Sequence, residues 1–388
     1  MMLNMNSCKL KLVPYGDGDF VSIRNGGYAY VDKTSFIESL ERGGVKHPFI
    51  VLPRRFGKTL FTSMLKAYYD AASSDLFEDL FKGTYIAEHK TASAGKFRVL
   101  RLDFSGISSQ NVMLGFCKKL QKCCGEFARR YPSEELKTCL NRDEQDPVNF
   151  ITDFFSAAGY GYDEKLYVII DEYDQFANEL LSEDVEEFKK ITSKNGFLKQ
   201  FYAALKSESV DGIVAHVFIT GVTSISLDSM SSGFNIRKDI SALPEYAQMF
   251  GFSEPELKAL IPQVIDLEKY GHSVDEIYER MKVLYDGYRF SPVQTNGVFN
   301  PSMSLYYLGA IRDTNAEPRQ LLDPAFSPDL SKVKGILSLG ESAFSKSVVE
   351  QALKRQVVKF GVPSTVINLN SVNMLSQKDV LTSMLLCV

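Results

Sequence analysis

Short runs of apolar residues alternate with helical patterns over the first two-thirds of the 388-residue chain. Residues 48–52 and 166–170 are nearly continuous apolar segments, and the second is rich in β-branched residues and bounded by polar ones. Such runs are typical of strands that are buried on both faces of a parallel sheet. Two further strands are predicted at 97–104 and 213–220. Strands that alternate with helices in this way predict a doubly wound α/β domain.

Apolar residues spaced three and four apart predict helices between and after these strands. They are expected at 60–69, 75–81, 111–131, 147–158 and 184–207, and then at 254–264, 274–285 and 301–312. Between the two groups, residues 223–233 are rich in Ser, Asp and Gly, and the next strand pattern comes only at 364–369. The sequence therefore predicts an α/β core followed by a mostly helical part that acts as a lid.

We divide the chain into four parts on this basis. Residues 1–46 form an N-terminal segment, 47–235 the α/β core, 236–315 the helical lid, and 316–388 a small C-terminal segment. A proline-containing loop near 317–329 marks the last boundary.

The bulk composition is ordinary for a globular protein, with 45% hydrophobic and 24% charged residues. The net charge of −4 and the pI of about 5.8 give no whole-protein basic footprint for nucleic acid. No apolar run approaches the roughly 18 residues that cross a membrane, and the first 13 residues lack the apolar core of a signal peptide. We therefore expect a cytoplasmic protein that does not bind membranes.

Six cysteines are present, and four of them cluster without paired C-x-x-C spacing. These four are Cys117, Cys123, Cys124 and Cys139. We interpret them as small buried apolar residues in a reducing compartment rather than as zinc ligands.

The segment after the first predicted strand has the features of a phosphate-binding loop. Phosphate binding needs backbone N–H groups at a helix start and a mobile cation, which Gly57 and Lys58 would supply. The hydroxyl of Thr59 would be a Mg²⁺ ligand. The candidate nucleotide-binding residues are Arg54, Arg55, Phe56, Gly57, Lys58, Thr59 and Leu60.

One position departs from the G-x-x-x-x-G-K-[ST] pattern, because Leu52 stands where the first glycine is expected and Pro53 follows it. Pro53 fixes its own φ and lacks an N–H donor, so the turn must have a different shape. Gly-Lys-Thr alone also fits an ordinary helix start with a surface lysine. Arg54 and Arg55 fit solvated loop arginines as well as added positive charge beside a triphosphate.

Two carboxylates, Asp171 and Glu172, directly follow the apolar run at 166–170. Ligands of open α/β sheets bind at the carboxyl ends of the strands, so these acids mark a site. Asp171 would orient Mg²⁺ or its water, and Glu172 would polarise the water that attacks in line. Asp174 has no required role, and capping of the next helix is the alternative interpretation for it.

Thr220, at the end of the strand predicted at 213–220, is the third catalytic candidate beside Lys58 and Glu172. A polar residue at that strand end could touch the γ-phosphate or the attacking water, and the alternative is a threonine that closes a buried strand. The strand at 97–104 intervenes between the loop and the acids. This extra strand is typical of the P-loop class that places its catalytic glutamate beside the acidic strand end.

These segments belong to a longer series that resembles the predicted AAA-ATPase-like family of bacterial proteins. The matching segments are 30–34, 53–59, 102–105, 170–174, 218–222, 232–236, 251–253, 285–290 and 300–301, in this order. The resemblance implies that the missing first glycine is usual for the family, although the family usually has Arg where this chain has Leu52. It also implies that the nucleotide is ATP and that residues 31–34 pack near it. Locally, those residues indicate only a helix start, with Asp32 as the N-cap of a helix at 33–40.

Many members of the family carry a C-terminal domain similar to the PD-(D/E)xK nucleases, and that pattern is not visible here. The chain ends in an apolar segment at 380–386, so we expect a truncated version whose apolar end favours self-association. Arg289 and Arg237 are further candidates for stabilising phosphate charge. For Arg289, the alternative is a loop that packs its two aromatic neighbours under the helical part.

The leading hypothesis is an ATPase that binds ATP with Mg²⁺ and uses hydrolysis to move the lid relative to the core. The second hypothesis is a nucleotide-binding switch or scaffold that does not hydrolyse ATP. The third is an accessory protein that handles nucleic acid, and the acidic charge balance counts against it. The sequence does not identify a protein client.

Overall fold

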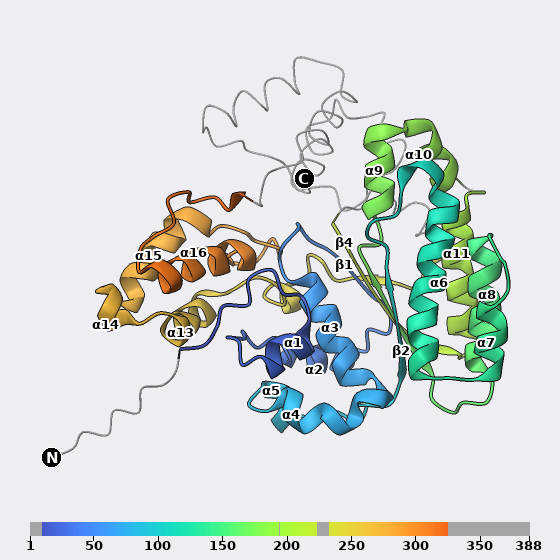
Figure 1. Ribbon diagram of the computed structural model, residues 1–388, viewed down its shortest axis with the longest axis horizontal. Coiled ribbons are helices and arrows are strands. Elements are labelled where there is room, and N and C mark those ends of the chain that lie inside the picture. The colour runs from blue at the N-terminus through green and yellow to red at the C-terminus, as the bar shows by residue number, and fades with distance from the viewer. Residues whose placement is uncertain (1–9, 194, 223–232, 325–388) are drawn as a thin grey trace.

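The computed structural model describes residues 10–193, 195–222 and 233–324, and it shows a parallel sheet with helices on both faces (Figure 1). The strands are β1 (Pro48–Val51), β2 (Arg98–Asp103), β3 (Leu166–Asp171), β4 (Val214–Gly221) and β5 (Lys238–Asp239). They pair in parallel in the order β2-β3-β4-β1-β5. The predicted α/β class with a parallel sheet is confirmed.

The order of the strands differs from their order in the sequence. β4 lies between β1 and β3, with Ile219 opposite both Phe49 and Ile170. β2, which separates the loop from the acids in the sequence, forms the edge of the sheet beside β3. The carboxyl ends of β1, β4 and β3 therefore lie side by side, which brings the loop after β1 close to the acids after β3.

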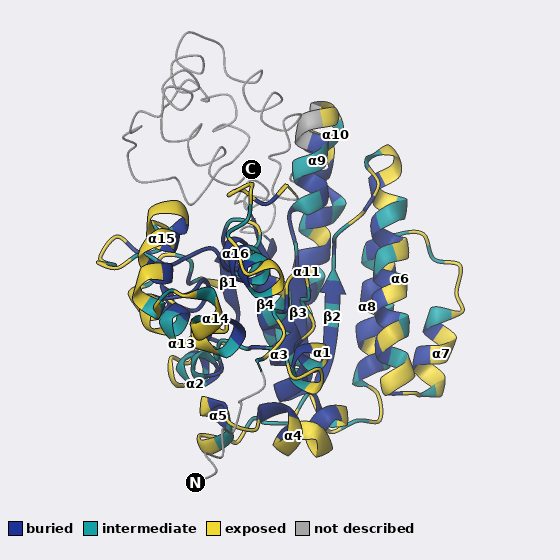
Figure 2. Cartoon of the chain, turned by 60° about the vertical axis from the view of Figure 1, so that its left-hand side comes forward, coloured by how far each residue is buried: buried dark blue, intermediate teal, exposed yellow. Residues whose placement is uncertain are grey.

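The central strand β3 is buried along its whole length, as its apolar run predicts. Leu166 and Val168 pack into one hydrophobic cluster, whereas Tyr167 and Ile169 pack into a second cluster on the opposite face. This alternation follows from the two-residue period of a strand. Figure 2 shows the buried strands enclosed between the two helical layers.

Helices from two stretches of the chain cover the two faces. The first face packs against α6 (Val112–Arg130), α7 (Glu134–Leu140), α8 (Pro147–Gly159), α9 (Gln175–Glu183), α10 (Val185–Thr192) and α11 (Phe197–Val210). The second face packs against α1 (Phe20–Asn25), α2 (Ser35–Arg42), α3 (Lys58–Tyr69), α4 (Phe77–Phe81) and α5 (Tyr85–Glu88). Short 3-10 turns, η1 (Ala71–Leu76), η2 (Ser109–Asn111) and η3 (Pro244–Tyr246), connect some of these elements.

The last described helices form a third hydrophobic cluster of their own. They are α13 (Glu254–Val264), α14 (Leu267–Tyr270), α15 (Val274–Tyr285) and α16 (Pro301–Thr314), and they lie to one side of the sheet (Figure 1). The bounds of α13 and α15 are those predicted from the sequence. Among the described helices, none combines the length and the apolar character needed to cross a membrane.

Several predictions about local structure need correction or fall outside the described ranges. α2 begins at Ser35 with Thr34 as its N-cap, so the prediction of Asp32 as N-cap is wrong. The Asp32 carboxylate instead accepts from Thr34 N at 2.9 Å and from Tyr85 N at 2.6 Å, which ties it to the start of α5. The helix predicted at 184–207 is two helices, α10 and α11. The strand at 364–369 and the apolar segment at 380–386 lie outside the described residues.

The four clustered cysteines are buried free thiols, as predicted. Burial raises the pKa of Cys117 to about 11 and also raises the pKa of Cys123 and Cys139. Cys124 lies wholly inside the cluster between α6 and α8. Thiols with raised pKa values are poor nucleophiles, so these residues act as packing groups.

Candidate functional site

The turn between β1 and α3 places the start of α3 beside open space. Gly57 is the N-cap of α3 with φ 88°, a left-handed conformation that glycine adopts without a Cβ clash. A Cβ placed on Gly57 would meet nothing within 4 Å. Arg55 is also left-handed, with φ 68°, which is uncommon for a residue with a side chain. The loop therefore presents backbone donors at the N-terminus of a 12-residue helix.

The side chains of Lys58 and Phe56 help to hold the loop in its conformation. Lys58 folds back over the turn, and its Nζ donates to Leu52 O at 2.9 Å and to Pro53 O at 2.8 Å. Phe56 is buried between Tyr288 and Phe290, with ring centroids 4.8 and 5.1 Å away. The turn thus rests on residues of the segment between α15 and α16, as well as on β1.

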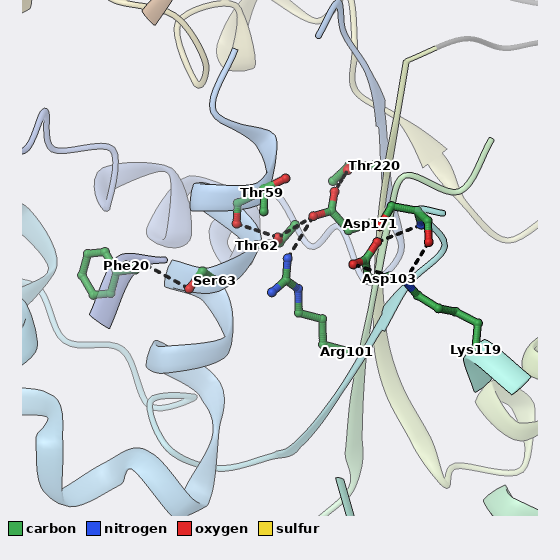
Figure 3. Close-up of polar contacts among 10 residues, drawn as sticks. Phe20, Thr59, Thr62, Ser63, Arg101, Asp103, Lys119, Asp171 and Thr220 are labelled. Atoms are coloured by element: carbon green, nitrogen blue, oxygen red, sulfur yellow. Dashed lines mark hydrogen bonds and ion pairs between the residues drawn. The ribbon is translucent and has the colours of Figure 1, made fainter. Parts of the chain in front are cut away.

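Asp171, at the end of β3, is buried and bound by side chains from three elements (Figure 3). Thr220 of β4 donates to Oδ1 at 2.7 Å. Oδ2 receives Thr62 of α3 at 3.3 Å and the guanidinium of Arg101 of β2 at 3.1 Å. The Thr62 hydroxyl also lies 2.9 Å from Thr59 O at the start of α3, and its single proton serves one of these two acceptors at a time.

Glu172 follows Asp171 but faces the cavity rather than the network. Its φ of 53° is left-handed, so the backbone turns the side chain away from the strand. Burial raises the pKa of Glu172, and the nearby carboxylates of Asp171 and Asp103 raise it further, whereas Lys58 and Arg54 lower it. Strained backbone and a perturbed carboxyl in the same residue are typical of functional sites.

A third acid sits beside these two in the sheet. Asp103, at the end of β2, is paired in register with Asp171. Its carboxylate accepts from Ser105 N at 2.9 Å and lies 3.7 Å from Lys119 Nζ of α6 (Figure 3). Asp103 and Asp171 thus each have their own cation, whereas Glu172 lines the cavity, as does Asp17 of the N-terminal segment.

A cavity of about 720 Å³ opens in front of the loop. Its polar part is formed by the loop and the strand ends, with Lys58, Ser105, Glu172 and Gln175. Its apolar lining comes from α1, the segment between α1 and α2, α3 and the helical part, and consists of Ile23, Ala29, Phe61, Met64, Met249, Phe250, Phe252, Leu260 and Leu305. Pocket volumes of this size and mixed lining are usual for small-molecule sites.

The structure separates the predicted site residues into two layers. Seven loop residues, Arg54, Arg55, Phe56, Gly57, Lys58, Thr59 and Leu60, line the cavity together with Glu172. Asp171 and Thr220 lie behind them, buried and bonded to each other. Asp174 stands at the N-cap position of α9, yet its carboxylate binds Val222 N at 3.0 Å rather than the helix start.

The two arginine candidates outside the loop, Arg289 and Arg237, are not among the residues that line the cavity. Arg289 is exposed, and its neighbours Tyr288 and Phe290 pack on Phe56, in agreement with the alternative interpretation of that segment. Arg237 lies over the ring of Phe49 of β1, with its guanidinium carbon 5.2 Å from the ring centroid. Residues 31 and 33 line the cavity, and the implied packing of the segment 31–34 near a nucleotide stays a prediction.

Sequence reasoning missed Arg101 and Thr62. The signal available for Arg101 was its charge within an otherwise apolar strand. It lies on the same face of that strand as Val99, which is buried in a hydrophobic cluster. Thr62 lies one turn beyond Thr59 on α3, so a helical wheel places both on one side of the helix. Neither pattern points to Asp171 as the partner.

The fold and the site define a parallel α/β protein with a glycine-lysine turn beside an acidic strand end. The chain matches the family described as "Predicted AAA-ATPase" over residues 14–231, which is more than half of its length. It therefore belongs to this family, as the resemblance predicted.

The chain is also similar to a curated protein whose description gives no activity. It is described as an uncharacterized protein in the vnfD 5′ region of Azotobacter chroococcum mcd 1, and it is 29% identical to this chain over 297 residues. The match covers 75% of this chain and 50% of the relative, so the chain spans about half the length of that protein.

Proposed function

We propose that the protein binds ATP with Mg²⁺ in this cavity and hydrolyses the terminal phosphoanhydride bond. The observation that carries the proposal is the meeting of Lys58, the start of α3 and Glu172 around one cavity. Hydrolysis would drive a change in the position of the helical part, because residues of both the core and the helices 254–314 line the same cavity.

The donor set fits a triphosphate. Gly57 and the first residues of α3 line the cavity, where the helix dipole favours an anion. The Lys58 ammonium and the Arg54 guanidinium both lie close enough to Glu172 to lower its pKa, so positive charge surrounds the same space. The apolar part of the cavity fits a purine base, which leaves the phosphates for the polar part.

The acids support hydrolysis rather than binding alone. Mg²⁺, when bound, would neutralise phosphate charge, with Thr59 and Asp171 as its proposed holders. The network of Thr62, Thr220 and Arg101 orients the Asp171 carboxylate for that role. Glu172 accepts the proton of the attacking water, and its raised pKa makes it a better base than an exposed glutamate.

Phosphate release by the purified protein tests the proposal, with two matched pairs of variants. Lys58→Ala and Glu172→Gln remove the two cavity residues, whereas Lys46→Ala and Glu164→Gln alter exposed residues just before β1 and β3, at the opposite ends of the same strands. We expect both cavity variants to lose at least about 100-fold in turnover and both controls to keep it. Equal turnover in all five proteins would refute the assignment.

Equilibrium binding of a fluorescent ATP analogue separates the switch from the enzyme. The altered loop entry at Leu52 and Pro53 is the feature that favours a switch. Binding that depends on Lys58 with no phosphate release would support the switch. Binding that depends on Lys58 together with phosphate release that depends on Glu172 supports the ATPase.

A further inference from the structure

The loop arginine Arg55 is bound by an acid from a distant part of the chain. Its Nη1 lies 3.2 Å from Oδ2 of Asp323, which is only 4% exposed. The hydroxyl of Tyr15 donates to the same carboxylate oxygen. Arg55 and Tyr15 both line the cavity, whereas Asp323 is not one of its lining residues. One carboxylate therefore joins the loop, the N-terminal segment and the stretch that follows α16.

The helical part fixes the position of Asp323. The stretch 317–323 is tied to α15 by the ion pair between Arg280 and Glu317 and by Tyr285 OH, which donates to Leu321 O at 2.6 Å. It is tied to α16 by Tyr306 OH, which donates to Gln320 O at 3.0 Å. Movement of these helices relative to the loop must therefore stretch the contact between Arg55 and Asp323.

The backbone of Arg55 is held separately from its side chain. Ser302, at the start of α16, donates its hydroxyl to Arg55 O at 3.4 Å. The guanidinium can exchange partners while this contact keeps the left-handed turn. Guanidinium groups bind carboxylates and phosphates with the same two-pronged geometry. A phosphate in the cavity and Asp323, which does not line it, are thus competing anions for one cation.

We propose that Asp323 is a further residue of this site, an internal anion that competes with nucleotide phosphate for Arg55. Phosphate binding draws Arg55 away from Asp323 and so breaks the direct link between the loop and the stretch 317–323. The inference rests on the proposed nucleotide site and adds a contact between that site and the helical part that phosphate binding would break.

Affinity for a fluorescent ATP analogue tests the exchange in a double-mutant cycle. Asp323→Asn keeps the shape of the side chain and removes the competing charge, so the affinity should rise about fivefold, and Arg55→Gln should lower it by a similar factor. In the Arg55→Gln background, Asp323→Asn should change the affinity less than about twofold. Asp313→Asn is the matched control, because Asp313 is an exposed acid on α16 whose replacement removes the same charge.

Several outcomes of these binding measurements would contradict the exchange or the nucleotide site. Unchanged or weaker binding by Asp323→Asn would overturn the exchange, and so would an equal gain in the Arg55→Gln background, which would indicate a general charge effect. A wild-type protein that does not bind the analogue, or binds it equally well after Lys58→Ala, would remove the nucleotide site itself. Dependence on Lys58 without any effect of Asp323→Asn would remove only the exchange.

Hydrogen exchange gives a second readout that needs no change at Asp323. Saturating ATP analogue should raise the amide exchange rate of residues 317–323 in the wild type, because the link through Arg55 is broken. The same addition should have little effect in Arg55→Gln, where the link is already absent. Unchanged exchange of this stretch in the saturated wild type would contradict the proposal.

Discussion

Replacement of Thr220 by valine isolates the bond that holds Asp171 from β4. The two side chains have nearly the same shape, so the change removes a hydroxyl and leaves the strand packing intact. In the native protein, Thr220 Oγ1 donates to Asp171 Oδ1 at 2.7 Å, and both side chains are buried. The variant leaves a buried carboxylate oxygen without its shortest donor. Hydrogen bonds to charged groups contribute about 1.5–3 kcal/mol, so we expect a loss of about 2 kcal/mol in the free energy of unfolding.

Urea unfolding followed by far-ultraviolet circular dichroism measures this loss, since the chain contains no tryptophan. Thr152→Val is the matched control, because the hydroxyl of Thr152 is exposed and bonds only within α8. The control should stay within about 0.5 kcal/mol of the wild type. A Thr220→Val protein as stable as the control would refute the role of this bond. Full stability with lost turnover would instead place Thr220 in contact with the substrate.

Three more changes test other parts of the account. Arg101→Gln should lower the free energy of unfolding by about 2 kcal/mol in urea, because the buried carboxylate of Asp171 loses its cation, and equal stability of the two proteins would contradict this. Phe56→Ala should cost about 3 kcal/mol in the same assay and weaken nucleotide binding, whereas Val283→Ala at an exposed site of α15 should do neither. Burial lowers the pKa of His47 to about 4, below its unfolded value of about 6.5. The unfolded chain therefore takes up this proton first, and stability that is present above pH 6.5 should fall by on the order of 1–3 kcal/mol toward pH 4. His47→Phe should show a smaller fall over that range.

The sequence predicted those elements whose signals are local. β3 was visible as an unbroken apolar run, and α13 and α15 were visible from their apolar period; the structure adds a Ser-x-x-Glu capping box at the start of each. β5 could not be predicted, because two residues carry no period, and it exists only through pairing with β1. Asp32 had the character of an N-cap, but its carboxylate is drawn to the start of α5, 53 residues away.

The residues of the candidate site also differ in whether a local sequence pattern predicted them. Lys58 and Glu172 were predicted because each stands at a fixed place beside a strand end, where parallel α/β topology brings strand ends together. The partners of that site come from far along the chain. Arg101 lies 70 residues from Asp171, and Asp323 lies 268 residues from Arg55. Such contacts depend on the packing of whole elements, so no local pattern in the sequence indicates them.

The central claim is that the glycine-lysine turn and the acids after β3 form one nucleotide site. A crystal structure with Mg²⁺ and a non-hydrolysable ATP analogue tests it most directly. We expect the phosphates to lie within hydrogen-bond distance of Lys58 Nζ and the first N–H groups of α3, with Glu172 facing the γ-phosphate. An analogue bound elsewhere on the protein, or phosphates turned away from α3, would contradict the account.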